Sequence, residues 1–457
     1  MNPPRSLREA AALLERRELS PTELTRACLD RITAKNDSLR AFITVTDTAA
    51  LADAARAEAE MAKGRYRGPL HGIPVSVKDL ADVAGTPTTS GSNVPPRQPR
   101  HDARVVANLR RAGAIIVGKT NLHEFAFGTT SDETAFGAVR NPFDHARSAG
   151  GSSAGAAVSL IEGMCYGALG TDTGGSIRIP AAACGVVGLK PTNGEISTDD
   201  VVPLSTTLDH VGPLALTVSD AALLYHAMLD GEAAVDHVPA DAEAPLWLGV
   251  PAPYFLDKLD DDVARLFASA RNALAAAGHT VSDVVVAHAD RTADVYLHIV
   301  LPEASWYHAP MLAAHADKYS PGVRLRFEMG RYVLAEDYLR AMHARSVLRR
   351  AVDKALEGLD ALLLPALAIG GPPIGAGSVT INGAPEPVRA IMLRLTQLFN
   401  ITGHPAIALP CGRGADGLPR GLQLVGHRGS TERLLAVAAT VERQIIGGAG
   451  SVGGGAG

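Results

Sequence analysis

The sequence predicts a single large α/β domain with a mixed central β-sheet sandwiched between α-helical layers. Short apolar runs of strand length alternate with amphipathic or Ala-rich stretches of helical length along the whole chain. The composition, with 46% hydrophobic and 20% charged residues, shows no break and suffices for one large core. We therefore expect one domain over residues 1–446, followed by a Gly-rich, disordered tail over residues 447–457.

The first part of the chain combines helix signals with short strands. Ser20-Pro21-Thr22-Glu23 is a capping box with proline at the first helical position. Residues 73–80 alternate, which places Val75 and Val77 on one face of a strand and Ser76 and Lys78 on the other. The elements expected here are two helices within 6–34, helices over 49–63 and 105–112, and strands over 41–45, 73–80 and 114–117.

The same alternation continues to the end of the chain. Residues 230–245 are acidic, Ala-rich and contain proline, so we expect a surface connection there. The strands expected beyond residue 180 are 185–189, 246–250, 280–286, 361–365 and 406–410, and the helices are 217–229, 260–277, most of 300–358, and 430–446. The runs 361–365 and 406–410 are the candidates for central strands because they are continuously apolar.

The stretch from residue 148 to residue 180 is the candidate site. It contains two Gly-Gly-Ser units, 24 residues apart, which end at Ser152 and Ser176. The apolar run between them suits one helix, with Ser152 and Ser153 as N-cap hydroxyls, and one buried strand that ends at Thr171. Ser176 then follows a Gly-Gly turn at the carboxyl end of that strand, beside unpaired backbone amides. Such an arrangement can bind and attack a carbonyl group.

Composition and spacing exclude several classes of function. The net charge of −5 offers no basic field for nucleic acid. The four cysteines are far apart, and the fifteen histidines show no His-x-x-x-His pattern, so neither a metal site nor a disulfide framework is expected. The first residues lack the apolar core of a secretory signal, and no run is long enough to span a membrane. We expect a soluble cytoplasmic protein.

Two short motifs match known patterns without their structural context. Residues 113–120 read GAIIVGKT and fit the phosphate-loop pattern, but the Ala-Ile-Ile-Val between the glycines reads as a strand and not as a flexible loop. Residues 151–155 fit the nucleophile elbow G-x-S-x-G, but the polar segment before them lacks the buried strand that an elbow requires. Nucleotide binding through Lys119 is kept as an alternative function, of a different class from hydrolysis.

Seven ordered motifs are spread over almost the whole chain. They are HGIPVSVKD (71–79), GKTNLHEF (118–125), FGAVRNP (136–142), GGSSAG (150–155), GTDTGGSIRIP (170–180), GVVGLKPT (185–192) and NITGHPA (400–406). Together they resemble the motifs of the amidase signature family. The sequence departs from the family pattern at Ala149, Ala154 and Glu195. None of these departures falls on a position that the resemblance makes catalytic, so they bear on loop shape and substrate preference.

The resemblance implies a Ser-Ser-Lys triad in an amide hydrolase that needs no cofactor and no metal. Ser176 would be the nucleophile, Ser152 the bridging serine held by a cis peptide, and Lys78 the base. Asp172 and Arg178 would hold the loop. The backbone amides implied for the oxyanion hole are those of Thr173, Gly174, Gly175 and Ser176.

A lysine can act as this base only if it is uncharged. Burial between Val75 and Val77 and the Gly-rich loops would lower the pKa of Lys78, because an ammonium ion loses its water there. Asp79 follows directly in the sequence, but strand alternation points it to the opposite face. We therefore expect no counter-charge from Asp79.

The substrate pocket is expected to be apolar or aromatic. Its candidate lining residues are Phe125, Ala126, Phe127, Gly128, Thr129, Trp306 and Tyr307, with core packing of the aromatic rings as the alternative. Small apolar or aryl amides, anilides and carbamates are the expected substrates. The runner-up is the glutaminase subunit of a tRNA-dependent amidotransferase, against which the segment 393–399 (LRLTQLF) offers no acid for a glutamine α-amino group. A homodimer and a requirement for a partner subunit both stay open.

Overall fold

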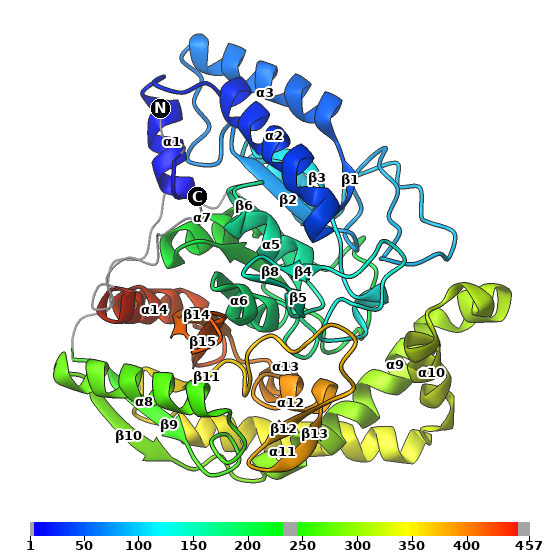
Figure 1. Ribbon diagram of the computed structural model, residues 1–457, viewed down its shortest axis with the longest axis vertical. Helices are drawn as coiled ribbons and strands as arrows, with labels where there is room; N and C mark the ends of the chain where they lie inside the picture. The colour runs from blue at the N-terminus through cyan, green and yellow to red at the C-terminus, as the bar shows by residue number, and fades with distance from the viewer. Residues whose placement is uncertain (1–3, 232–244, 447–457) are drawn as a thin grey trace.

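The computed structural model describes residues 4–231 and 245–446, and they form an α/β fold around one large mixed sheet (Figure 1). The strand order is β1-β3-β2-β6-β8-β7-β14-β15-β11-β9-β10. These strands are β1 (Phe42–Val45), β2 (Pro74–Lys78), β3 (Ile115–Thr120), β6 (Gly167–Thr171), β7 (Val187–Lys190), β8 (Val211–Ala215), β9 (Trp247–Pro251), β10 (Thr280–Val284), β11 (Ala361–Pro365), β14 (Ala406–Arg413) and β15 (Pro419–Val425). The hairpins β4 (Arg140–Asn141) with β5 (Asp144–Ser148) and β12 (Ser378–Ile381) with β13 (Ala384–Pro387) lie outside the sheet.

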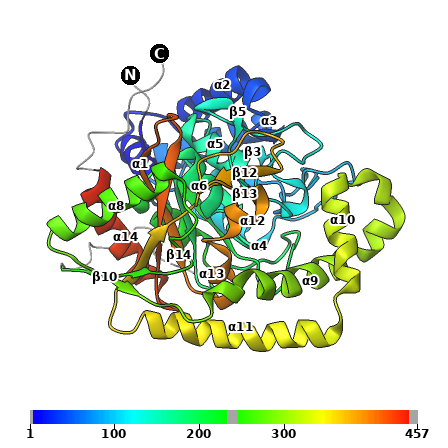
Figure 2. The ribbon, with the colours of Figure 1, turned by 60° about the horizontal axis from the view of Figure 1, so that its bottom comes forward.

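Helices cover the sheet and extend beyond one end of it. They are α1 (Leu7–Glu15), α2 (Pro21–Leu39), α3 (Asp47–Ala62), α4 (Arg104–Arg111), α5 (Ala154–Ile161), α6 (Arg178–Cys184), α7 (Val218–Met228), α8 (Asp261–Ala276), α9 (Thr292–His315), α10 (Pro321–Met329), α11 (Ala335–Ala355), α12 (Val388–Leu393), α13 (Gln397–Thr402) and α14 (Thr431–Ile446). Figure 2 shows α9, α10 and α11 reaching outward from the helices that pack on the sheet.

The strands next to the candidate site run parallel, which brings their carboxyl ends to one edge. β2 pairs in parallel with β3 on one side and with β6 on the other. Lys78 is the last residue of β2, and Thr171 is the last residue of β6. Because neighbouring parallel strands end at the same sheet edge, Lys78 and the loop that follows Thr171 come together there.

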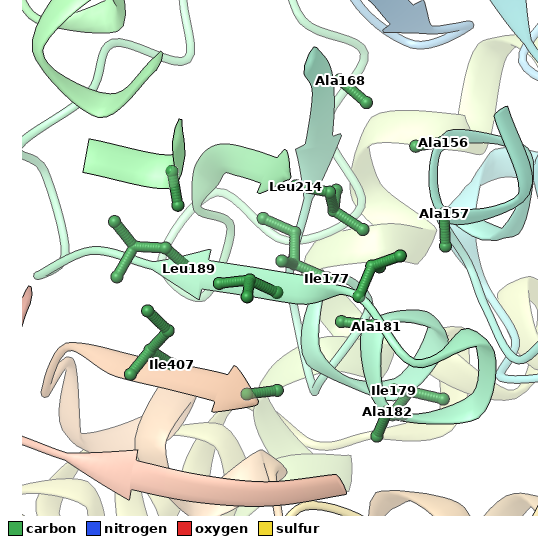
Figure 3. Packing of buried hydrophobic residues seen from close by; sticks show 14 of the residues in the cluster. Ala156, Ala157, Ala168, Ile177, Ile179, Ala181, Ala182, Leu189, Leu214 and Ile407 are labelled. Atoms are coloured by element: carbon green, nitrogen blue, oxygen red, sulfur yellow. The ribbon is translucent and has the colours of Figure 1, made fainter. Parts of the chain in front are cut away.

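Small side chains let two short helices lie close to the sheet. Figure 3 shows Ala156 and Ala157 of α5 and Ala181 and Ala182 of α6 among Leu189, Leu214 and Ile407 of the central strands. Ile177 and Ile179 are fully buried in this cluster, on either side of Arg178. Their burial fixes the chain on both sides of the turn from the candidate loop into α6, because close-packed interiors tolerate little displacement.

The predicted fold class and nearly all predicted elements are confirmed. The capping box at Ser20 forms as expected, with the Ser20 side chain accepting from the Glu23 backbone and the Glu23 side chain accepting from the Ser20 backbone. Of the connection predicted at 230–245, residues 232–244 lie outside the described residues, and so does the tail predicted at 447–457.

Two central strands, β8 and β15, were not predicted. β8 carries Gly212-Pro213 in its middle, and proline is normally absent from a central strand because it cannot donate to the ladder. β15 begins with proline and contains Gly421 and Gln423. Both strands are fully buried, so tertiary packing overrode the local sequence signal.

Candidate active site

Lys78 lies at the centre of the candidate site, with a fully buried side chain. Its Nζ is 2.8 Å from the hydroxyl oxygens of Ser152, Ser153 and Thr171. Val75 and Val77 are buried as predicted, and so are Ser76 and Lys78, because helices cover both faces of β2. The structure therefore brings the predicted base and the predicted bridging serine into direct contact.

Burial is the main influence on the charge of this lysine. It lowers the pKa of Lys78 from its ordinary value to about 7, while the more distant carboxylates of Asp172 and Asp209 act weakly in the opposite direction. Asp79 is not a partner of Lys78, as predicted. Its carboxylate pairs instead with Lys119, at 2.7 Å, and accepts a hydrogen bond from the Thr89 backbone.

The two serines of the predicted triad come from the turn before α5 and the turn before α6. The Gly151–Ser152 peptide bond is cis, as the family resemblance implied. Ser152 is fully buried, whereas Ser176 is 5% exposed. The Ser153 backbone donates to the Ser176 carbonyl oxygen at 3.2 Å, which ties the two turns together.

The prediction that Ser152 and Ser153 cap α5 with their hydroxyls is wrong. Ser153 occupies the N-cap position, but its side chain makes no capping hydrogen bond. The hydroxyl of Ser153 donates to the Thr171 carbonyl oxygen at 3.1 Å and contacts Lys78 Nζ. The buried lysine uses the hydroxyls that the local sequence pattern assigns to the helix.

The loop after β6 presents backbone amides that have no internal partner. No described residue accepts a hydrogen bond from the backbone N–H of the four residues 173–176. Thr396 Oγ1 donates to the Gly174 carbonyl oxygen at 2.6 Å and thereby fixes the loop from the far side. Gly175 has φ of +141°, and a Cβ there would lie 2.2 Å from Thr396 Oγ1, so only glycine fits.

Asp172 and Arg178 form the buried ion pair that holds this loop. Arg178 Nη2 donates to Asp172 Oδ1 at 2.9 Å and Arg178 Nε to Oδ2 at 3.0 Å. Asn400 bridges the pair, because it accepts from Arg178 and donates to Asp172. Burial, the largest single influence, favours the neutral acid, but Arg178 together with Lys190 and Asn400 outweighs it and holds the pKa of Asp172 well below its usual range.

We expect Arg178→Met to lower the free energy of unfolding by about 3–5 kcal/mol, because it leaves the Asp172 carboxylate buried without its counter-charge. The control is Arg104→Met, which removes an exposed ion pair with Asp230 and should cost less than about 1 kcal/mol. Urea unfolding followed by circular dichroism measures both changes. A loss in Arg178→Met no larger than that of the control would contradict a structural role for the pair.

A cavity of about 210 Å³ adjoins the loop and the end of β6. Thr171 and Thr173 border it, and Asp209 lies in its wall, where it accepts from Thr173 Oγ1 at 2.6 Å and from two backbone amides. Burial raises the pKa of Asp209 to about 6. The apolar part of the wall consists of Leu80, Ala126, Val201, Val202, Pro203, Leu204 and Val211.

The structure separates the residues that were predicted to line the pocket. Of the seven, Ala126 borders this cavity. Phe125 and Phe127 pack on Phe327, in a buried group that also contains His308. The Trp306 side chain is 72% exposed on α9 and does not border the cavity. Trp306 therefore does not contribute to the wall of this cavity, which combines aliphatic and polar side chains.

Neither of the two short motifs, at residues 113–120 and 151–155, has the structure that its function needs. Residues 115–120 form β3, and Lys119 is fully buried with its Nζ on Asp79 and on Thr88 Oγ1. A phosphate could not reach this ammonium group. The segment before Ser152 is the peripheral strand β5, which pairs with β4 and forms a bridge to Pro373 but does not belong to the central sheet.

Four contributors to the site were missed in the sequence. Ser153 and Thr171 contact Lys78, Thr396 fixes the loop, and Asp209 holds Thr173. Thr396 and Asp209 are distant in sequence from the residues they hold, so only the tertiary structure could pair them. Among the residues that the structure describes, no cluster of metal-ligating side chains is found and no helix could span a membrane.

Comparison with known proteins identifies the class of enzyme to which this fold belongs. The model of the amidase family matches residues 23–435, so the chain belongs to the amidase family and is an amidohydrolase. It is 38% identical to an amidase of Pseudomonas putida, with 90% of each chain covered. It is also 36% identical to the A-type subunit of the glutamyl-tRNA(Gln) amidotransferase of Anaeromyxobacter sp. strain K, with 96% of each covered.

A solved structure gives the same result for the fold. A crystal structure of an amidase superimposes with a TM-score of 0.90 at 37% identity, over 96% of this chain and 100% of that one. The single large α/β domain predicted from the sequence is therefore the amidase fold.

Proposed function

We propose that the chain hydrolyses the C–N bond of small amides through an acyl-enzyme on Ser176, with Ser152 and Lys78 as a proton relay. The contact between a fully buried Lys78, with a pKa near 7, and the Ser152 hydroxyl is the observation that carries this proposal. A neutral lysine has two N–H groups and one lone pair. Ser153 and Thr171 can accept the two N–H groups, because the Ser153 proton is already donated to Thr171 O, which leaves the lone pair for Ser152.

In the proposed reaction, Ser176 Oγ attacks the amide carbonyl carbon while its proton passes to Ser152, whose own proton passes to Lys78. The unpaired amides of residues 173–176 stabilise the oxyanion that forms. Collapse of the tetrahedral intermediate breaks the C–N bond, and the relay returns the proton to the leaving amine. Water then attacks the acyl-enzyme along the same relay and releases the acid.

The substrate we propose has a compact apolar or aryl group on one side of the scissile bond. The apolar residues in the wall of the 210 Å³ cavity support this choice, and the polar residues of the same wall include Thr173 of the proposed nucleophile loop. Anilides and aryl carbamates remain candidates. A cytoplasmic location and a homodimer remain predictions from the sequence.

We expect acetanilides to be hydrolysed with a higher kcat/KM than aliphatic amides of equal size, because an aniline is a less basic leaving group and its flat ring fits the apolar part of the cavity wall. The measurement compares kcat/KM for the purified chain on matched pairs of neutral amides. A clear preference for the aliphatic member of each pair would contradict the proposed substrate class.

The glutaminase alternative is tested with the same protein. The amidotransferase relatives keep this function open, but Leu393 contacts the loop at Gly174, and the segment 393–399 contains no acid for an α-amino group. We expect negligible release of ammonia from glutamine by the chain alone. Rapid glutamine hydrolysis that appears only with a partner subunit would favour the alternative.

A further inference from the structure

Arg389, in the first turn of α12, is a cation with no carboxylate at ion-pair distance among the described residues, although Glu133 acts on it from farther away. Among the described residues it has no ion-pair or hydrogen-bond partner, and its Nε is buried. Its guanidinium carbon lies 5.6 Å from the centre of the Phe127 ring. Burial lowers the pKa of Arg389, but a guanidinium keeps its proton at any practical pH, so the charge stays. Arg389 is partly exposed and only its Nε is fully buried, so its terminal nitrogens are accessible to an anion that is supplied from outside the chain.

The other cations around Arg389 already have partners. Arg326, on the same Phe127 ring at 5.5 Å, pairs with Glu133 at 2.6 Å. Arg394 donates to the Tyr254 carbonyl oxygen at 2.7 Å, and Lys258 pairs with Glu386. Of these four cations, only Arg389 is left without a neutralising contact.

The position of Arg389 connects it to the proposed catalytic loop. Arg389, Tyr296 and Leu393 border one cavity of about 150 Å³. Tyr296 and Leu393 also contact the loop, because a Cβ placed on Gly174 would lie 2.6 Å from Tyr296 Oη and 3.0 Å from Leu393 Cδ2. Tyr296 and Leu393 therefore lie between the cavity of Arg389 and the loop at Gly174, whereas Thr173 of the loop itself borders the 210 Å³ cavity.

We propose that Arg389 binds a carboxylate of the substrate, so that the enzyme acts on amides in which one half is apolar or aryl and the molecule carries a carboxylate group. The planar guanidinium fork matches a carboxylate in geometry and charge. The Tyr296 hydroxyl, between Arg389 and Gly174, is a further donor for the same group. This inference rests on the proposed amidase function and specifies its substrate class.

Two matched pairs of substrates test this proposal and show which half carries the charge. 4-Acetamidobenzoate and 4-methylacetanilide differ in a carboxylate on the amine half, and 4-carbamoylbenzoate and 4-methylbenzamide differ in one on the acyl half. In the parent enzyme we expect the carboxylate member of at least one pair to have the higher kcat/KM. The preference is the ratio of kcat/KM for the carboxylate member of a pair to kcat/KM for its neutral member. Arg389→Gln should lower this ratio by about 30-fold or more, as for loss of one member of a charge pair.

The control variant is Arg413→Gln. It removes the same charge and a similar ring contact, with Phe143 at 4.2 Å, from an exposed site on β14, and should keep the parental ratio. Arg389→Lys retains the charge without the fork, and should give a ratio between those of the parent and Arg389→Gln. Thermal unfolding followed by circular dichroism shows that each variant is folded.

Two outcomes would overturn the assignment of Arg389. One is a parent that favours the neutral member of both pairs, and the other is an unchanged ratio in Arg389→Gln. If the proposed amidase function itself is wrong, the result differs from both of these outcomes. The parent would then hydrolyse none of the four amides, or Ser176→Ala would hydrolyse them as fast as the parent. Hydrolysis of the neutral amides that requires Ser176, without any preference for a carboxylate, would remove the inference and leave the proposed function intact.

Discussion

Lys78→Arg should lower kcat/KM by roughly 10³-fold or more, because the base of the relay can no longer accept a proton. Loss of a positioned general base typically costs about 10²–10⁴-fold. Arginine keeps the positive charge at any practical pH, and its guanidinium is too large for a fully buried site with three hydroxyls at 2.8 Å from the lysine nitrogen. Lys78→Ala should lose most activity as well, because no base remains.

The pH dependence of the parent enzyme tests the same feature without a substitution. The reactive form of Lys78 is the neutral one, and burial places its pKa at about 7. We therefore expect kcat/KM to rise with pH through about 7 and to fall tenfold per pH unit well below it, where the ammonium form dominates. An ordinary exposed lysine would place this rise near pH 10.

The control for the lysine variants is Lys35→Arg. Lys35 is a partly exposed residue that pairs with Glu162, so arginine should be tolerated there with little change in rate. Initial rates between pH 5 and pH 10, measured for the parent and for both position-78 variants, show whether Lys78 acts as a neutral base. Near-parental activity of Lys78→Arg would show that the neutral-lysine mechanism is wrong and that another base has to be sought.

Ser176→Ala should abolish formation of the acyl-enzyme and lower kcat by about 10⁴–10⁶-fold, as for other serine nucleophiles. Ser152→Ala should lose rate but keep some acylation, because a relay position can be bypassed more easily than the nucleophile. The double variant should be hardly slower than Ser176→Ala alone, because members of one catalytic unit act in a strongly non-additive way.

Labelling with a fluorophosphonate, followed by peptide mapping, identifies the nucleophile directly. We expect the label on Ser176 in the parent enzyme and none in Ser176→Ala. Ser159→Ala is a suitable control, since Ser159 is a buried serine of α5 that contacts Ala156 and Ser76 and not the relay. A label on Ser152 or Ser153 in the parent would show that the assignment of the nucleophile is wrong.

Much of the fold could be predicted from the sequence because it depends on local patterns. The capping box at Ser20 and the apolar alternation around Val75 act over a few residues, and both formed as predicted. The placement of Lys78 at the end of a strand and of Ser176 after a glycine turn also depends on neighbours in sequence. The fold class followed because these local elements alternate along the whole chain.

Packing overrode the local pattern where burial or distant contacts were stronger. β8 is a central strand in spite of Pro213, because β6 and β7 bury it from both sides. Trp306 was expected in a pocket because aromatic residues are scarce, yet it lies on the exposed side of α9. The sequence contains no signal for which face of such a helix meets the rest of the protein when apolar residues occur all around it.

The sequence by itself determined the order of the elements and was enough to propose Lys78, Ser152 and Ser176 as the triad, since short-range patterns and motifs carry that information. The tertiary structure alone decided what surrounds them. It placed the Ser153 and Thr171 hydroxyls on the lysine instead of on the helix end, and it brought Thr396 to the glycine loop from 222 residues away. The physical reason is that hydrogen bonding and burial depend on distance in space, which the covalent order of the chain does not specify.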